Sequence, residues 1–285
     1  VQCHHRPVAI NALLQVFADH SLYLIRYELE AEILQQVRHP HSVPYIDHFQ
    51  DGANFYLVME YMGGGNLYDR LSNHGALSIP DANRILLGIS DALTALHRRH
   101  IIHRDLKPEN ILLSMQGKPY LCDFGEAYML NNNGVTDPAL STVAGTPYYA
   151  APETWNGQTQ NAQSDVWALG IVMFEMLTGE VPFKGTTVDE VKQRIQHAPL
   201  PDIQQLRPDL PAGLQQILAK SLDKELARRY YTVRDFHDDV KRGQPSRFRL
   251  KTETLVAGTV VMLLIVVLLS YLLFGTSSET PSPDD

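Results

Sequence analysis

A run of about twenty uncharged residues near the C-terminus restricts this chain more than any other feature. Residues 255–274, "LVAGTVVMLLIVVLLSYLLF", contain no Asp, Glu, Lys or Arg. About 20 apolar residues in a helix span ~30 Å, the thickness of the hydrocarbon core of a bilayer. A buried core helix is the alternative, but this run is apolar on every face and lies at the end of the chain. The sequence therefore predicts a globular part followed by one transmembrane helix.

The charges on either side of this run predict its orientation. Residues 241–254, interpreted as a basic juxtamembrane linker, hold five Lys or Arg, whereas residues 275–285 hold only acidic charges. Basic residues favour the cytoplasmic side of a cell membrane. We therefore expect the large domain to lie in the cytoplasm. The Ser/Pro-rich tail, 275–285, would lie outside as a disordered segment.

Residues 1–240 alternate apolar runs with turn signals, and they predict an α+β domain. The formal net charge of -8 argues against a nucleic-acid partner. Strands are predicted at 6–13 and 55–61, and residues 26–39 show the apolar spacing of a helix. Later helices are predicted at 79–98, 162–178, 187–197 and 211–222. A β-rich piece followed by a helical piece suggests two lobes, which we place at 1–62 and 63–240.

The stretch "IIHRDLKPENILL", residues 101–113, places charged and amide side chains between two apolar runs. A polar connecting loop would explain the polarity but not the choice of residues. The next segment, "ILLSMQGKPYLC", predicts a hairpin that turns near Gly117 and brings Asn110 beside Asp123, with Asp105 close by. Carboxylate and amide oxygens suit Mg²⁺. With Lys107 nearby, the group indicates transfer of a phosphoryl group.

Four motifs occur in order along the chain. They are "HRDLKPEN" at 103–110, "DFG" at 123–125, "GTPYYAAPE" at 145–153 and "SDVWALGIVMFEMLTGEVPF" at 164–183. Through them, residues 1 to about 240 resemble the eukaryotic-type (Hanks-type) protein serine/threonine kinases, in the form common among bacterial membrane-anchored kinases. The resemblance implies the two-lobed kinase fold and binding of ATP.

The resemblance also implies a role for each residue of the catalytic motifs. Asp105 would accept or orient the proton of the substrate hydroxyl, and Lys107 would neutralise charge on the transferred phosphoryl group. Asn110 and Asp123 would hold Mg²⁺, with Mn²⁺ as an alternative. His103 could look like a general base, but in this family it is a packing residue of the loop.

The segment "YLVMEYM" resembles the hinge that binds the adenine of ATP. Glu60 and Met62 would offer backbone groups to adenine, and Met59 would guard the back pocket. An ordinary buried strand is the alternative, and the two interpretations are compatible. Glu30 lies at the position where the family has a glutamate on its N-lobe helix.

Two positions indicate the substrate. Lys107 stands two residues after Asp105, as in kinases of Ser and Thr, and Thr146 resembles the Ser/Thr-type docking loop. We therefore expect protein substrates with Ser or Thr hydroxyls. Arg104 would pair with a phosphate on the activation segment, for which Ser141 and Thr142 are candidate acceptors.

Those two hydroxyls are also compatible with plain polar loop residues. Self-phosphorylation between neighbouring molecules, in a homodimer, is a hypothesis that depends on them. Three further residues are expected to support the fold. Glu153 and Arg229 should form a buried ion pair, and Asp165 should accept backbone hydrogen bonds from the catalytic loop.

The chain departs from the family pattern in its first strand, which reads "VAIN" where the family has V-A-I-K. Asn11 cannot form the ion pair with Glu30, and no Lys occurs before Lys107. The Gly-rich loop would precede Val1, so we expect an N-terminally truncated domain. Two hypotheses follow. One is an active kinase that takes a lysine from a preceding segment, as the "with no lysine" kinases do. The other is a membrane-anchored pseudokinase scaffold or receptor. The intact catalytic residues favour the first.

Overall fold

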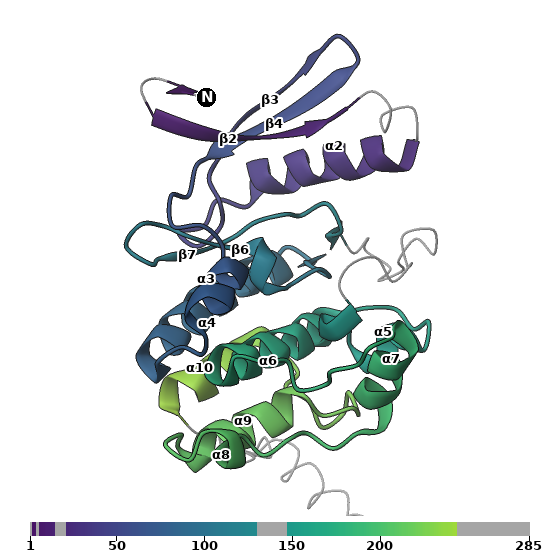
Figure 1. Ribbon diagram of the computed structural model, residues 1–285. Coiled ribbons are helices and arrows are strands. Elements are labelled where there is room, and N and C mark those ends of the chain that lie inside the picture. The colour runs from purple at the N-terminus through teal and green to yellow at the C-terminus, as the bar shows by residue number, and fades with distance from the viewer. Residues whose placement is uncertain (1, 4–5, 15–20, 130–146, 244–285) are drawn as a thin grey trace, which may run out of the picture. The chain divides into compact units, whose positions relative to one another are not determined.

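An antiparallel sheet and one long helix form the first part of the molecule (Figure 1). The computed structural model describes residues 2–3, 6–14, 21–129 and 147–243. These residues all belong to one unit of the chain, Val1–Pro245. The strands are β1 (Gln2–Cys3), β2 (Arg6–Leu13), β3 (Tyr45–Asp51) and β4 (Asn54–Glu60), in the order β1-β2-β4-β3.

The helix α2 (Ser21–Gln36) lies along one face of this sheet (Figure 1). Tyr27 connects the two layers, because its hydroxyl donates to the Tyr56 carbonyl at 2.9 Å and its ring packs on Phe55. Ile33 and Leu34 are fully buried on the same helix. Burial of such apolar side chains is the main force that fixes a helix on a sheet. This packing positions α2 so that Glu30 contacts Phe124, which lies far along the chain in the DFG motif.

Short elements connect the sheet to the helical part. They are α3 (Leu67–His74), α4 (Ile79–His97), β5 (Ile101–Ile102), the 3₁₀ turn η1 (Pro108–Asn110), β6 (Ile111–Leu113), β7 (Pro119–Leu121) and β8 (Tyr128–Met129). Strands β6 and β7 form the predicted hairpin, with Ile111 opposite Leu121. Gly117 in its turn has a φ of 75°, a backbone conformation that glycine adopts without steric cost. The hairpin therefore forms for the reason expected from its sequence.

The helical part is built around α6 (Ala162–Thr178). Its other elements are η3 (Pro147–Tyr149), α5 (Pro152–Trp155), α7 (Val188–His197), α8 (Ile203–Leu206), α9 (Ala212–Ser221) and α10 (Val233–Arg242). Asn161 and Ser164 cap the start of α6 reciprocally, and Gly179 ends it in the left-handed conformation. The Trp167 and Phe183 rings stack in the core at 5.9 Å. Thirteen of the seventeen residues of α6 are buried, so this helix is the most deeply enclosed element of the helical part.

The predicted strands and helices are confirmed, and most of their ends differ by at most one residue from the prediction. The exception is the helix predicted at 26–39, which begins five residues earlier, at Ser21, and ends at Gln36. Helices α3 and α10 were not predicted, and α10 continues to Arg242, into the stretch 241–254 that we interpreted as linker. Within residues 2–3, 6–14, 21–129 and 147–243, no helix combines the length and the apolar character that a membrane span requires. The predicted span, 255–274, and the tail, 275–285, lie outside the described residues.

Candidate active site

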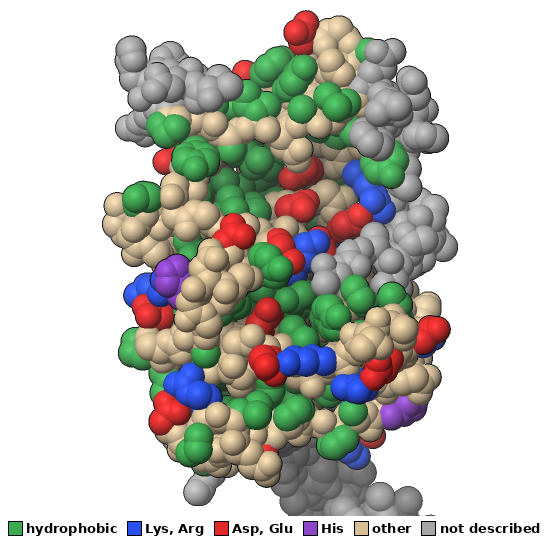
Figure 2. All heavy atoms as spheres, in the orientation of Figure 1, with side chains coloured by type: hydrophobic (Ala, Val, Ile, Leu, Met, Phe, Trp, Pro, Cys, Tyr) green, Lys and Arg blue, Asp and Glu red, His purple; other side chains and the backbone are tan. Residues whose placement is uncertain are grey.

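A cavity of about 330 Å³ lies where the sheet, α2 and the loops after α4 meet. Its lining includes Asn11 on β2, Arg26 and Glu30 on α2, and Asp105 and Asp123 from the loops. Figure 2 shows acidic side chains gathered in the hollow between the sheet and the helical part, with a few basic ones among them. Of the residues predicted for catalysis, Asp105 and Lys107 thus share one cavity with Asp123 and with Asn11, the altered strand position, whereas Asn110 is not part of its lining.

Asp105 is held in a fixed orientation by two donors from its own loop. Lys107 Nζ lies 2.6 Å from Asp105 Oδ2, and Asn110 Nδ2 donates to the same oxygen at 2.9 Å. The amide of Asn110 also donates to the Asp105 carbonyl at 2.8 Å. Asn110 is buried, and its own carbonyl accepts from the N–H of Cys122 at 3.0 Å. Hydrogen bonds therefore connect the residues of the catalytic loop with one another and also join this loop to Cys122, just after β7.

The catalytic loop is also bound to α6 through Asp165. This buried carboxylate accepts from the backbone N–H groups of His103 and Arg104, each at 3.0 Å, as predicted. Burial opposes its ionisation, but the His97 ring, with Nε2 2.7 Å away, and His103 together outweigh this and hold the pKa of Asp165 below its ordinary value. Arg104 has a φ of 69°, a conformation that a non-glycine residue keeps only when its surroundings fix it. The carboxylate of Asp165 supplies that constraint.

His103 is a packing residue, as predicted, and not a general base in the cavity. It is fully buried, and its ring packs edge-on against Phe124 with the centroids 5.3 Å apart. The Nε2 atom lies 3.2 Å from the carbonyl oxygen of Cys122. Cys122 itself is a mostly buried thiol, and burial raises its pKa.

Asp123 provides the second carboxylate on the floor of the cavity. Its backbone has a φ of 61°, and its Oδ1 accepts from the N–H of Gly125 at 3.3 Å. The side chain is exposed to the cavity, which Asp105 and Lys107 also line. The bond between Asn110 and Cys122 places Asn110 next to the residue that precedes Asp123. The β6–β7 hairpin thus places Asn110 and Asp123, two residues of the predicted metal-binding set, in one region.

The donor chemistry of this set suits a hard divalent cation. Among the described residues there is no group of three or more His, Cys, Asp or Glu side chains with metal-binding geometry. The predicted set instead consists of one amide and two carboxylates, which is too few ligands for an enclosed protein site. Mg²⁺ usually keeps several waters and takes one or two carboxylates plus substrate phosphates. A set of this size is therefore compatible with a cation that arrives with a nucleotide.

Glu30 reaches this region from α2 and contacts the DFG motif. Its Oε1 accepts from the N–H of Phe124 at 3.3 Å, and its side chain is buried. Burial, with the negative charge of Asp123 added, raises the pKa of Glu30 to about 7. Asn11 lines the same cavity, but within the described residues neither a hydrogen bond nor an ion pair joins it to Glu30. Loss of the strand lysine thus leaves a buried acid without the usual cation.

The hinge residues lie at the end of β4. Met59 pairs with Ala9 of β2, and the N–H of Glu60 donates to the Pro44 carbonyl at 3.0 Å. Met62 follows in an irregular segment and is buried. Their contacts with adenine stay a prediction.

The activation segment is only partly described. Arg104 Nε donates to Gln160 Oε1 at 2.5 Å. Ser141, Thr142 and Thr146 lie outside the described residues, so their predicted roles are not tested.

Two residues that sequence reasoning missed also line the cavity. Arg26 Nη1 lies 2.5 Å from Glu126 Oε1, and this ion pair joins α2 to the residue after the DFG motif. Burial raises the pKa of Glu126, although Arg26 acts in the opposite direction. Arg26 precedes Glu30 by four residues, which is one helical turn. That spacing was the available signal for placing Arg26 beside the cavity.

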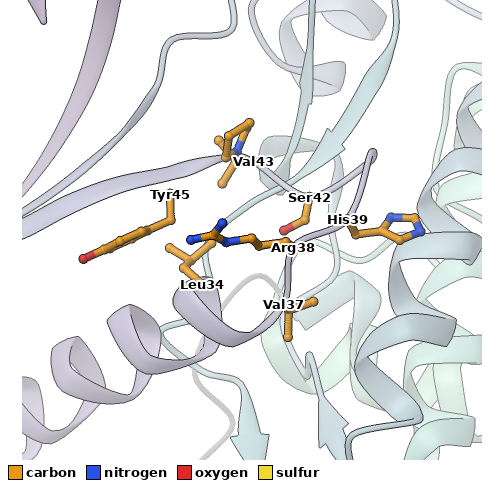
Figure 3. A pocket seen from close by; sticks show the side chains of 8 residues that line it. Leu34, Val37, Arg38, His39, Ser42, Val43 and Tyr45 are labelled. Carbon is orange, nitrogen blue, oxygen red and sulfur yellow. The ribbon is translucent and has the colours of Figure 1, made fainter.

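A second cavity, of about 290 Å³, lies at the C-terminal end of α2 (Figure 3). Leu34 and Val37 form its apolar side, and Arg38 extends across it toward Tyr45 (Figure 3). The buried hydroxyl of Ser42 has no hydrogen-bond partner within the described part of the chain. This cavity contains none of the predicted site residues.

One cavity is lined by Asp105, which two donors hold in place, by Asp123 of the DFG motif and by Glu30 of α2. This arrangement is typical of a protein kinase domain. The sequence model of the protein kinase domain matches residues 4–238. The chain therefore belongs to the protein kinase family, and its relatives place it among the Hanks-type serine/threonine kinases.

Three bacterial proteins are examples of these relatives. The probable serine/threonine-protein kinase PknB of Lactococcus lactis is 32% identical over 235 residues, 82% of this chain and 37% of that protein. The serine/threonine-protein kinase PrkC of Bacillus subtilis is 33% identical over 236 residues, 83% of this chain and 36% of that protein. PknD of Mycobacterium tuberculosis is 33% identical over 232 residues, 81% of this chain and 35% of that protein. This chain spans about a third of the length of these relatives.

Proposed function

We propose that this chain transfers the γ-phosphoryl group of ATP to Ser or Thr hydroxyls of proteins. The observation that carries the proposal is the orientation of Asp105 by Lys107 and Asn110, in the cavity that Asp123 also lines. A carboxylate held in this way can orient the substrate hydroxyl and accept its proton. Lys107, already 2.6 Å from Asp105, supplies positive charge where the phosphoryl group passes.

A divalent cation, Mg²⁺ or Mn²⁺, would neutralise charge on the phosphates when bound. Asn110 and Asp123 are the residues that would hold it. Asp165 keeps the loop in place by binding two of its backbone N–H groups, so the carboxylate of Asp105 does not have to be ordered when substrate arrives. Such preorganisation lowers the cost of reaching the transition state.

Radiolabelled ATP tests this proposal directly. The full chain is incubated with a generic protein substrate under Mg²⁺ or Mn²⁺, beside Asp105→Asn. We expect label on Ser or Thr, and a reduction of about 100-fold or more in the variant. Asp51→Asn, at the exposed end of β3, is the control and should keep full activity. Equal labelling by wild type and Asp105→Asn would show that another protein in the preparation is responsible.

A pseudokinase scaffold is the second candidate, and Asn11 is the observation that favours it. No lysine from the described strand reaches Glu30, so one normal contact to the nucleotide phosphates is missing. Under this alternative, the wild-type chain transfers no label with either cation. It would still bind partner proteins through an unchanged fold.

Membrane anchoring through residues 255–274 is part of the proposal and is supported by sequence alone. The kinase domain would then lie on the cytoplasmic side, because the basic residues precede the span. A chain that ends at residue 254 should move from the membrane fraction to the soluble fraction. Membrane retention of this shorter chain would contradict the proposal.

Regulation by phosphate on Ser141 or Thr142, received by Arg104, completes the proposal. Self-phosphorylation between two copies would supply that phosphate, and Thr146 would help to dock the substrate. Replacing Ser141 and Thr142 together with Ala should lower both activity and phosphate content. Undiminished values of both would remove this part.

A further inference from the structure

Arg26 occupies a position from which it can take over the task of the missing strand lysine. It lies on α2 one turn before Glu30, and it lines the same cavity as Asn11, Asp105 and Asp123. Its side chain is 19% exposed, so the guanidinium is largely withdrawn from bulk water. The cation therefore faces the cavity from the helix and not from the strand.

The hydrogen bonding of Arg26 is incomplete. Nη1 pairs with Glu126 Oε1 at 2.5 Å, but the buried Nε has no acceptor within the described part of the chain. A guanidinium carries five N–H donors in a planar fork. Buried donors without partners are unfavourable, so this one indicates an acceptor that binds from the cavity.

The lining of the cavity is net negative, so an anionic acceptor for Arg26 is favoured there only when it binds together with a cation. Four carboxylates line the cavity in the described part of the chain: Glu30, Asp105, Asp123 and Glu126. Only two cations stand against them there, and Lys107 is already engaged with Asp105. Lys107 keeps further N–H donors of its own, but in the described part of the chain Arg26 is the cation of this lining that has a buried donor without a partner.

We propose that Arg26 binds the phosphates of the nucleotide in place of the strand lysine. This inference rests on the proposed function, because it takes the nucleotide site as given. A guanidinium matches a phosphate with two parallel N–H···O bonds. Glu126 holds Arg26 at the cavity through Nη1, and the donors that Glu126 does not use contact phosphate oxygens.

Binding of ATP and of adenosine to the full chain separates the contribution of the phosphates from that of the base. Isothermal titration calorimetry with Mg²⁺ measures both affinities. Wild type should prefer ATP. In Arg26→Gln the affinity for ATP should fall by about 10- to 100-fold, while that for adenosine stays unchanged. Arg38→Gln, an exposed arginine beyond the end of the same helix, is the matched control and should leave both affinities unchanged.

Two more variants distinguish phosphate binding from a purely structural ion pair. Glu126→Gln removes the negative charge, but its amide oxygen can still accept from Arg26 Nη1 and hold Arg26 at the cavity, so the preference for ATP should persist. Asn11→Lys added to Arg26→Gln should restore most of the lost ATP affinity. If Glu126→Gln loses the preference as Arg26→Gln does, the ion pair is structural and the inference is wrong.

Failure of the inference can be told apart from failure of the proposed function. If wild type binds neither ATP nor adenosine, the nucleotide site itself is refuted, and the inference falls with it. If wild type prefers ATP and Arg26→Gln keeps the full preference, only the role of Arg26 is refuted.

Discussion

Buried carboxylates have different partners in the helical part and in the cavity. In the helical part, Glu153 and Arg229 are 3% and 0% exposed, and two hydrogen bonds of 2.9 and 3.1 Å join them. Ser164 also donates to this carboxylate, and Arg229 packs over the Trp167 ring. In the cavity, Glu30 is similarly buried, but from the described residues it receives one backbone N–H and no cation.

This comparison distinguishes charged side chains that stabilise the fold from charged side chains that are available to bind a ligand. The pair in the helical part is neutralised within the chain, so it needs nothing from solution. In the cavity, burial and then the negative charge of Asp123 raise the pKa of Glu30. The excess of acids over cations in the lining favours binding of a cation. Variants that change only one of the two regions can test this distinction.

Removing Arg229 should have the largest effect. Arg229→Met leaves Glu153 charged and buried without a cation, which should lower the free energy of unfolding by about 3–5 kcal/mol. Arg194→Met is the control, because it breaks the exposed pair with Glu190 and should cost less than about 1 kcal/mol. Urea unfolding at pH 7 measures both. Equal losses would show that burial of the first pair has no special energetic weight.

Replacing Glu30 should have the next largest effect, and of the opposite sign. The folded pKa of Glu30 is raised to about 7 from an ordinary value of 4.5, so the folded protein binds this proton more tightly than the unfolded chain does. Stability is therefore lost as the pH rises through this window. Glu30→Gln should stabilise the protein by up to about 3 kcal/mol at pH 8, and by almost nothing near pH 4.5.

Urea unfolding at several pH values measures this difference. Glu28→Gln, an exposed position on the same helix, is the control and should show no such pH dependence. A wild-type protein that is more stable than Glu30→Gln at pH 8 would mean that the charge of Glu30 is compensated after all.

Restoring the strand lysine should have the smallest effect. In Asn11→Lys the new ammonium lies in the cavity with Glu30, lowers its pKa and stabilises the folded protein at pH 8 by about 1 kcal/mol. The gain should shrink at pH 5, where Glu30 is protonated in the folded state. Asn73→Lys, exposed on α3, is the control. An equal gain at both pH values would show that the lysine acts elsewhere than on Glu30.

The local sequence pattern and the motifs were sufficient to predict much of the fold and several side-chain contacts. The β6–β7 hairpin follows from a turn glycine between two apolar runs, and the helices follow from apolar spacing. The contacts of Glu153 with Arg229, and of Asp165 with the catalytic loop, came from motif resemblance and are confirmed.

What pattern could not predict depends on distant parts of the chain. The spacing of Arg26 from Glu30 could place Arg26 beside the cavity, but its ion pair with Glu126 joins residues a hundred positions apart. The raised pKa of Glu30 depends on its burial and on the position of Asp123. Helix α10 does show apolar residues at Val233, Phe236 and Val240, so its helical spacing was present but overlooked.

The attachment of the catalytic loop to α6 has a mechanical consequence. Because Asp165 accepts hydrogen bonds from the backbone of the two residues before Asp105, we expect the proton acceptor to move together with α6, the most enclosed helix of the helical part. Arg26 and Glu30 belong instead to α2. Within the described part of the chain, this helix is linked to the DFG region by the Arg26–Glu126 ion pair and by the hydrogen bond from the Phe124 N–H to the Glu30 carboxylate. Any rocking of the sheet would therefore change the spacing of the nucleotide-side groups while leaving the acceptor stationary.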